Sequence, residues 1–335
     1  MSMEKFKALV VDEVRENVFQ RSIKEKSIEE LSQGDVIIKV EYSALNFKDA
    51  LSARGHKGIT RIYPHTPGVD AAGIIKESSS NLFVTGEKVF VTGYDLGMNT
   101  DGGFGQYIRV PSGWVIKVPE NFSTKEIMIY GTAGFTAGIA MYELQRNEIT
   151  PGKGKILVTG ATGAVGSIAV AMLSKAGYDV VASTGKTDKK DFLFNLGAKE
   201  VISREDVNDT SGKPLLKKQW IGAIDNVGGS TLSTIIRSIG HRGLVASIGL
   251  VQSDKFETTV YPFILRGVRL IGVDSAESHM DYRLKIWNKI FDEWRLENPE
   301  KLIKECTLIE LDKEIELILM GGQTGKVVIK MINEL

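Results

Sequence analysis

The stretch KILVTGATGAVGS (residues 155–167) decides the fold of this 335-residue chain. A strand-like run leads into three glycines at three-residue spacing, Gly160, Gly163 and Gly166, and small and aliphatic residues follow. This order predicts a buried strand, a tight turn and a helix. Glycine lets the backbone approach an anion closely, and the free N–H groups at a helix start favour that anion. The stretch therefore predicts the phosphate-binding turn of a dinucleotide site.

Strand and helix patterns alternate after this turn, which predicts a parallel, doubly wound sheet. The first third of the chain differs, because short β-prone runs separated by Gly, Pro, Asn and Ser are typical of a compact, barrel-like β unit. We therefore expect an α/β protein of two domains. The expected β-rich domain comprises residues 1–123 and 300–335, and the expected dinucleotide-binding domain comprises residues 124–299.

Composition excludes several function classes. The 42 basic and 42 acidic residues give a net charge of zero, which does not favour nucleic acid or an anionic membrane as partner. Cys306 is the single cysteine, so an intrachain disulfide and a Cys-rich zinc site are impossible. The sequence shows no signal-peptide pattern and no uninterrupted apolar run of membrane-spanning length. We expect a cytoplasmic protein.

The end of the second strand after the turn distinguishes NADP from NAD. NAD sites usually place a carboxylate there to bind the ribose 2′-hydroxyl. This chain has Ser183, Thr184, Gly185 and Lys186 instead, and Arg204 follows the third strand. Hydroxyl groups and cations suit the 2′-phosphate of NADP through charge-assisted hydrogen bonds. The alternative for Lys186 is an ordinary solvated lysine at a helix start.

The glycine pattern also resembles the Thr-Gly-x-x-x-Gly-x-Gly turn of short-chain reductases. Those enzymes need a Tyr-x-x-x-Lys pair for proton transfer. None of the nine tyrosines in this chain has a lysine four residues later. The chain therefore lacks the proton-transfer pair that a short-chain reductase requires.

Motifs along nearly the whole chain support a different resemblance. The chain resembles the zinc-free quinone oxidoreductase branch of the medium-chain dehydrogenase/reductases, and within it the acryloyl-CoA reductases. This resemblance implies a GroES-like β-rich catalytic domain followed by a Rossmann domain. The motifs that carry it are SALNFKDAL (43–51), PHTPGVDAAG (64–73), DGGFGQY (101–107), GTAGFTA (131–137), AIDNVGG (223–229), PFILRGVRLIGVDS (262–275) and TGKVVIK (324–330).

One motif argues against a catalytic metal. Zinc-dependent relatives carry Pro-Gly-His-Glu where this chain has Pro67-Gly68-Val69-Asp70, and the four histidines show no ligand spacing. We therefore expect no metal. Without a Lewis acid, reduction of an activated double bond fits better than oxidation of an alcohol.

The resemblance implies hydride transfer from NADPH to the β-carbon of an enoyl thioester or enone. Three residues of the LNFKD segment are catalytic candidates: Asn46 as a donor to the enolate, Asp49 as an orienting group or proton relay, and Lys48 for the enolate charge or a cofactor phosphate. The alternative is that Asn46 and Asp49 hold a turn and that Lys48 is solvated. Phe47 departs from the family, which commonly has tyrosine there, and if that hydroxyl supplies the proton in relatives, this chain must use water or another group.

The resemblance also implies a set of cofactor-binding residues, with Phe47 against the nicotinamide. The VRLIGVD segment (268–274) is expected to be an edge strand that pairs across a homodimer. The remaining expected cofactor residues are Thr132, Gly160, Thr162, Gly163, Ala164, Val165, Ser183, Thr184, Gly185, Lys186, Arg204, Leu250, Ile264, Ser275 and Lys326.

Three functions stay open from the sequence. The first is an NADPH-dependent reductase of acryloyl-CoA or a similar small enoyl-CoA. The second is a broader quinone or enone reductase. The third is a protein that binds NADPH without catalysis.

Overall fold

The computed structural model describes residues 4–331, and the chain divides into two compact units. The division at 123/124 and 299/300 stays a prediction, and in the structure residues 276–284 belong to the first unit. The described part of the first unit is 4–132, 276–284 and 298–331, and the second unit is 133–275 and 285–297.

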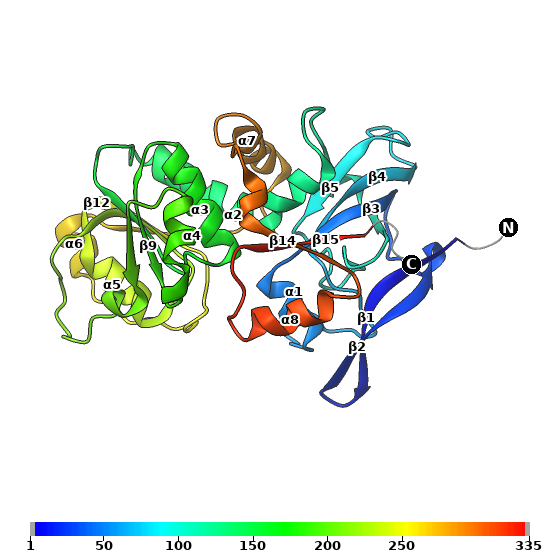
Figure 1. Cartoon of the computed structure of the whole chain (residues 1–335), viewed down its shortest axis with the longest axis horizontal. Helices are drawn as coiled ribbons and strands as arrows, with labels where there is room; N and C mark the ends of the chain where they lie inside the picture. The colour runs from blue at the N-terminus through cyan, green and yellow to red at the C-terminus, as the bar shows by residue number, and fades with distance from the viewer. Residues whose placement is uncertain (1–3, 332–335) are drawn as a thin grey trace. The chain divides into compact units, whose positions relative to one another are not determined.

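A seven-stranded sheet forms the centre of the first unit, in the order β14-β15-β3-β4-β5-β7 with β6 paired to β3 (Figure 1). Its pairs are antiparallel except β14–β15, and β1 and β2 form a separate antiparallel hairpin. The elements are β1 (Lys5–Arg15), β2 (Val18–Ser27), η1 (Ile28–Glu30), β3 (Val36–Leu45), α1 (Phe47–Ala53), β4 (Asp70–Ser78), β5 (Lys88–Thr92), β6 (Tyr107–Val110), η2 (Ser112–Trp114), β7 (Ile116–Lys117), η5 (Pro299–Leu302), β14 (Ile303–Thr307), α8 (Leu311–Leu319) and β15 (Lys326–Lys330).

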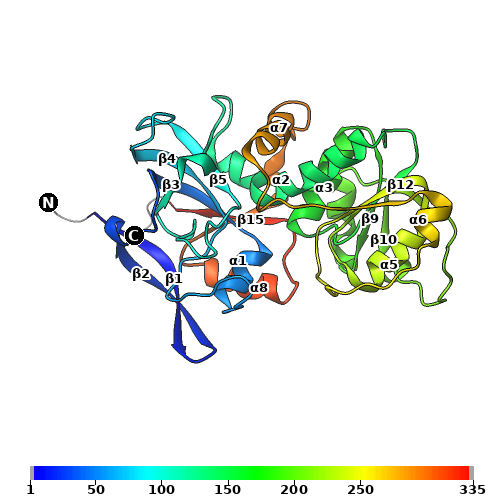
Figure 2. The same ribbon diagram turned by 180° about the vertical axis from the view of Figure 1, so that it is seen from behind.

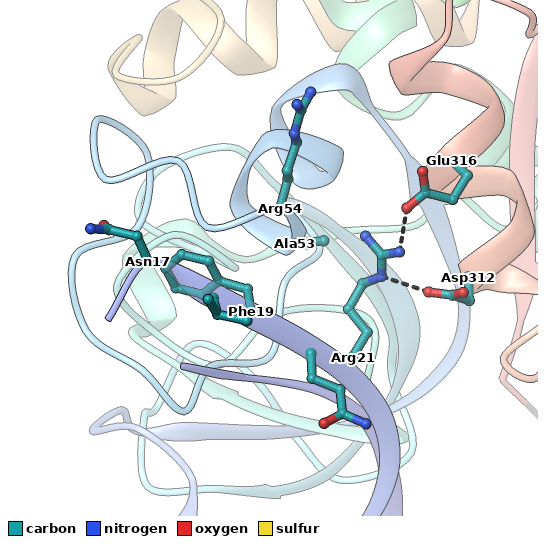
Figure 3. Close-up of a pocket in the computed structure, with 9 residues that line it drawn as sticks. Asn17, Phe19, Arg21, Ala53, Arg54, Asp312 and Glu316 are labelled. Atoms are coloured by element: carbon teal, nitrogen blue, oxygen red, sulfur yellow. Dashed lines mark hydrogen bonds and ion pairs between the residues drawn. The ribbon is translucent and has the colours of Figure 1, made fainter. Parts of the chain in front are cut away.

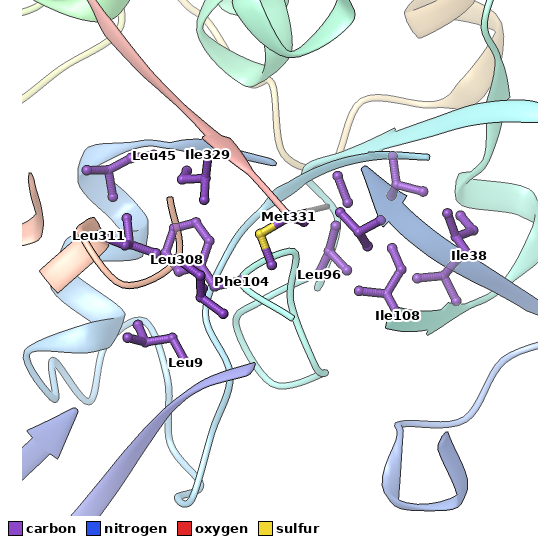
Figure 4. Packing of buried hydrophobic residues seen from close by; sticks show 14 of the residues in the cluster. Leu9, Ile38, Leu45, Leu96, Phe104, Ile108, Leu308, Leu311, Ile329 and Met331 are labelled. Carbon is purple, nitrogen blue, oxygen red and sulfur yellow. The ribbon is translucent and has the colours of Figure 1, made fainter. Parts of the chain in front are cut away.

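One apolar core joins segments from both ends of the chain in this unit (Figure 4). Leu9 from β1, Ile38 from β3, Ile329 from β15 and Leu311 from α8 are all buried in it. Burying one such side chain contributes about 1.5–3 kcal/mol, so β15 and α8 are integral to the first unit despite their late position in the sequence.

A parallel six-stranded sheet forms the second unit, in the order β10-β9-β8-β11-β12-β13. Both views show α3 on one side of β9 and α5 and α6 on the other (Figures 1 and 2). Strands that follow β8 in sequence are added first on one side of it (β9, β10) and then on the other (β11, β12, β13). Such sheets bind ligands at this switch point between β8 and β11. The elements are β8 (Lys155–Val158), α3 (Ala164–Lys175), β9 (Asp179–Thr184), η3 (Thr187–Lys189), α4 (Lys190–Asn195), β10 (Glu200–Ser203), η4 (Arg204–Val207), β11 (Trp220–Asp225), α5 (Gly229–Ser238), β12 (Ile239–Ser247), α6 (Tyr261–Arg266) and β13 (Arg269–Gly272).

Two helices contain residues of both units. Helix α2 (Thr124–Arg146) is interrupted at Gly131, whose φ of 47° and ψ of −151° are not helical. Helix α7 (Met280–Phe291) begins in the first unit and ends in the second. In the second unit its Trp287 is fully buried and stacks on Phe135 of α2 with ring centroids 5.9 Å apart.

Several elements were not predicted from the sequence, namely β2, β14, α1, α5, α6 and α8. Strand β2 is mostly polar and half exposed, so it lacks the apolar alternation that marks a strand. Helix α5 begins Gly-Ser-Thr and is buried on all sides, so neither propensity nor a polar face reveals it. Within residues 4–331 no helix is long and apolar enough to cross a membrane.

Candidate active site

A buried carboxylate, Asp70 at the start of β4, is the centre of a polar cluster in the first unit. Its oxygens accept hydrogen bonds from Asn46 Nδ2 at 2.9 Å and from the Thr132 hydroxyl and backbone N–H at 2.6 and 2.9 Å. Lys326 Nζ lies 3.2 Å from Asp70 Oδ2 and 3.2 Å from Asn46 Oδ1. The side chains of Asp70 and Lys326 have no exposed surface. A buried ion pair needs such additional hydrogen bonds to offset the loss of water.

Gly131 makes this cluster sterically possible. A Cβ at this position would lie 2.5 Å from Asp70 Oδ2 and 3.0 Å from Lys326 Nζ, and the positive φ also disfavours any other residue. The break in α2 at Gly131 frees the next N–H group, that of Thr132, to donate to Asp70 instead of to a helix carbonyl. The interruption of α2 is therefore part of the site.

Asp49 is a second buried carboxylate, and it fixes the turn between β3 and α1. Its Oδ2 accepts the backbone N–H of Asn46 at 2.8 Å, and its Oδ1 accepts the N–H of Val69 at 2.8 Å. Burial, and then the negative charge of Asp70, raises the pKa of Asp49 to about 7. Asp49 thus joins the start of α1 to the residue before Asp70.

Asn46 is held at both ends of its amide group. Its Oδ1 accepts from Lys326, and its Nδ2 donates to Asp70 at 2.9 Å, with Asp49 Oδ2 at 3.2 Å and the Ala44 carbonyl at 3.3 Å as further acceptors. An amide nitrogen has two hydrogens, and both point to protein acceptors here. The arrangement suits a positioning role better than donation to an enolate.

Phe47 and Lys48 follow Asn46 on the first turn of α1. Phe47 is 40% exposed, which is unusual for a phenyl ring. Lys48 is partly exposed, and within residues 4–331 the structure gives its ammonium group no hydrogen bond or ion pair. These two side chains, unlike Asn46 and Asp49, are available to a ligand.

In the second unit, the predicted glycine turn follows β8 and leads into α3. Gly160 has φ 56°, and Gly163 donates its N–H to the Gly160 carbonyl at 2.9 Å. A Cβ on Gly166 would lie 2.4 Å from that carbonyl oxygen, so only glycine lets α3 begin this close to the turn. The first-turn N–H groups of Ala164 and Val165 have no partner within the helix. This turn fits a pyrophosphate.

Lys186 and Arg204, the expected cations for a 2′-phosphate, lie at neighbouring positions. A Cβ on Gly185 would meet the Arg204 guanidinium at 2.0–2.2 Å, so this group lies directly over Gly185. Burial lowers the pKa of Lys186. Ser183 and Thr184 are buried: the Ser183 hydroxyl donates to the Ser203 carbonyl at 3.4 Å. The cations, rather than these hydroxyls, are therefore the groups that suit a phosphate.

The remaining predicted cofactor residues lie elsewhere in their units. Thr162 is buried, and its hydroxyl is 3.2 Å from that of Thr184. Leu250 follows β12 and is 58% exposed, and Ile264 on α6 is 69% exposed. Ser275 is the last residue of the long segment of the second unit. The structure places Thr132 and Lys326 in the Asp70 cluster of the first unit.

A surface pocket of about 500 Å³ lies in the first unit between β2, α1 and α8 (Figure 3). Arg21 crosses it to pair with Asp312 at 2.5 Å and with Glu316. None of the predicted site residues lines this pocket. Among residues 4–331 there is also no group of three or more His, Cys, Asp or Glu side chains that could hold a metal ion.

Sequence reasoning missed a network at the end of β11. Asp225 is buried and accepts hydrogen bonds from the Thr159 hydroxyl at 2.6 Å and the Gly228 N–H at 2.9 Å. Burial raises the pKa of Asp225. Asn226 donates its Nδ2 to the Thr159 carbonyl at 2.8 Å. The only available signal was the position of AIDNVGG after a buried strand, at the edge where ligands bind.

Family models match both units of the chain. Residues 32–120 match the alcohol dehydrogenase GroES-like domain, and residues 164–289 match the zinc-binding dehydrogenase domain. Acrylyl-CoA reductase AcuI from Ruegeria pomeroyi is 39% identical over 97% of this chain and 98% of its own length. YhfP from Bacillus subtilis, provisionally named a quinone oxidoreductase, is 45% identical over 92% of this chain and 94% of its own length.

Two solved structures are similar over nearly the whole chain. The yhdH oxidoreductase from Salmonella enterica in complex with NADP has a TM-score of 0.93 and 36% identity, covering 97% of this chain and 99% of that one. Bacillus subtilis yhfP with NAD bound has a TM-score of 0.94 and 43% identity, covering 98% and 99%. The predicted fold class is confirmed, and the chain belongs to the medium-chain dehydrogenase/reductase family of oxidoreductases, in the branch of acrylyl-CoA reductase and quinone oxidoreductase.

Proposed function

We propose that this protein uses NADPH to reduce the activated C=C bond of acryloyl-CoA or a similar small enoyl-CoA. The observation that carries this proposal is the similarity to acrylyl-CoA reductase AcuI over 97% of the chain. The site supports it: in the position where zinc-dependent relatives carry the Glu of Pro-Gly-His-Glu, this chain has Asp70, whose charge is neutralised by Lys326. The thioester carbonyl already withdraws electrons from the β-carbon, so this reduction needs no external Lewis acid.

The second unit supplies the proposed cofactor site. The turn at Gly160–Gly163 and the N–H groups of Ala164 and Val165 hold the pyrophosphate, and Lys186 and Arg204 hold the 2′-phosphate. Similar structures contain NADP in one case and NAD in another, so the preference for NADP rests on these two cations. When bound, the nicotinamide supplies the hydride.

The first unit supplies the proposed substrate groups. Lys48, whose ammonium group has no partner among residues 4–331, stabilises the enolate oxygen or a cofactor phosphate, and Phe47 packs against the nicotinamide. Asn46 and Asp49 position this segment through the contacts described above. Phe47 has no hydroxyl, so we propose that water donates the proton to the α-carbon.

A broader quinone or enone reductase is the second candidate, because YhfP is 45% identical to this chain. The same hydride donor and enolate-stabilising groups serve a quinone. What differs is the acceptor, which for an enoyl-CoA carries a long anionic portion. Acceptor preference therefore discriminates the two candidates.

The substrate assay follows NADPH oxidation with acryloyl-CoA, crotonyl-CoA and 1,4-benzoquinone. We expect kcat/KM for acryloyl-CoA to exceed that for the quinone by at least tenfold. A quinone rate far above the acryloyl-CoA rate would establish the second candidate instead. NADPH binding without turnover of any acceptor would identify a non-catalytic NADPH-binding protein.

The Lys186→Ala variant tests cofactor choice. Loss of one charge-assisted hydrogen bond costs about 1.5–3 kcal/mol, which corresponds to a roughly 10- to 100-fold weaker Kd for NADPH. The Kd for NADH, which lacks the 2′-phosphate, should change little. Lys190→Ala removes an exposed lysine nearby and serves as the control. Equal weakening of both cofactors would contradict the 2′-phosphate assignment.

The Asp49→Asn variant tests the pKa of the buried carboxyl. The pKa of Asp49 is about 7 in the folded protein and about 4 in the unfolded chain. Between these two pH values the folded state binds more protons than the unfolded state. The contribution of Asp49 to the free energy of unfolding therefore falls as the pH rises. Denaturation at pH 5, 6 and 7 should show the wild type losing up to about 1.4 kcal/mol per pH unit relative to Asp49→Asn. The control is Glu120→Gln at an exposed position. Parallel profiles for wild type and Asp49→Asn would show that the pKa is not raised.

We also propose a homodimer through β13. Within residues 4–331 this strand is at the edge of the sheet and pairs with β12 alone, and exposed apolar residues such as Leu265 lie on the preceding α6. Light scattering should give twice the chain mass of 36.8 kDa. Gly272→Pro removes an N–H on the outer side of the strand, since the N–H of Val273 donates to β12 and that of Gly272 points away from it, and this variant should give a folded monomer. A monomeric wild type, or a variant that remains dimeric, would exclude this interface.

A further inference from the structure

A buried hydrogen-bond acceptor without a donor lies beside the glycine turn of the second unit. The Oδ1 atom of Asn226 is shielded from solvent, and no hydrogen-bond donor reaches it within residues 4–331. Buried polar groups in folded proteins nearly always have partners, so an unmatched acceptor requires an explanation. It does not arise from disorder of the side chain, because the rest of this side chain is held in place.

The orientation of the Asn226 amide follows from its neighbours. Its Nδ2 lies 2.8 Å from the carbonyl oxygen of Thr159, which can only accept. Turning the amide over would bring two oxygens together, so Oδ1 must point the other way. The backbone N–H of Asn226 also donates to the Thr159 hydroxyl at 3.0 Å, and that hydroxyl donates to Asp225 at 2.6 Å. Oδ1 is therefore presented in a fixed direction.

The position of Asn226 in the sheet places it next to the proposed cofactor site. It follows β11, and the switch point in strand order lies between β11 and β8. A Cβ on Gly160 would lie 3.3 Å from the Cβ of Asn226, so this side chain adjoins the first glycine of the phosphate-binding turn. In such sheets a dinucleotide lies across this switch point, with one nucleoside on each side of the turn.

The direction of the cofactor determines which nucleoside Asn226 meets. Lys186 and Arg204 follow β9 and β10, so the adenosine half extends to that side of β8. The half beyond the pyrophosphate then lies on the β11 side. The donors nearest the pyrophosphate in that half are the hydroxyl groups of its ribose, and Oδ1 can only accept.

We propose that Asn226 Oδ1 accepts a hydrogen bond from a hydroxyl group of the nicotinamide ribose. This inference rests on the proposed cofactor site and adds a binding residue to it. Because this acceptor is already shielded from water without a ligand, it loses no hydration on binding, and the new hydrogen bond contributes fully to affinity. Asn226 also fixes the distance between the ends of β8 and β11 through Thr159.

The test compares two ligands on the variants Asn226→Ala and Asn226→Leu. NADP contains the nicotinamide ribose, whereas 2′-phosphoadenosine 5′-diphosphate contains the 2′-phosphate and the pyrophosphate without it. Calorimetry should show a roughly tenfold weaker Kd for NADP in both variants and an unchanged Kd for the fragment. Asn195→Ala, which removes an exposed amide of the same unit, is the control and should bind both ligands normally.

Each other outcome overturns the inference in a distinguishable way. Equal weakening of NADP and the fragment would show that Asn226 acts only by shaping the glycine turn. Unchanged NADP binding in both variants would show that Oδ1 stays without a partner when the cofactor binds and does not meet a ribose hydroxyl. If the wild-type protein binds neither NADP nor NAD, the proposed cofactor site fails and this assignment fails with it.

Discussion

The buried contact between Asp70 and Lys326 is the interaction on which the first unit depends. It joins β4 to β15, which are 256 residues apart in sequence, and through Asn46 and Thr132 it also fixes α1 and the break in α2. A buried charge that loses its partner costs about 3–5 kcal/mol, so each partner constrains the others. This cluster therefore fixes the position of the turn that carries Phe47 and Lys48.

The glycine turn and the Asp70 cluster differ in how far apart their residues lie in the sequence. In the glycine turn, Gly160, Gly163 and Gly166 lie within seven residues, so sequence spacing alone specifies the backbone. Arg204 lies over Gly185 because β9 and β10 are adjacent parallel strands, which the alternation of strands and helices already implies. These features could therefore be predicted.

The Asp70 cluster could not be predicted in the same way. Its members come from four separate segments, and nothing near Lys326 in the sequence indicates that its side chain is fully buried beside a carboxylate. The resemblance suggested Asn46 as a donor to the enolate, but residue identity does not reveal that Asp70 and Asp49 already occupy its amide hydrogens. Asn226 was missed for a related reason, since an unmatched acceptor becomes visible only when all its neighbours are placed.

The pairing of β15 with β3 has a consequence for the order in which the protein assembles during synthesis. The residues of β15 are synthesised after those of β1 to β14, yet this strand lies between β14 and β3 in the sheet. The parallel sheet of the second unit is complete in sequence at Gly272. The second unit can therefore form its sheet on the nascent chain, whereas part of the edge of β3 in the first unit stays unpaired until β15 has been synthesised.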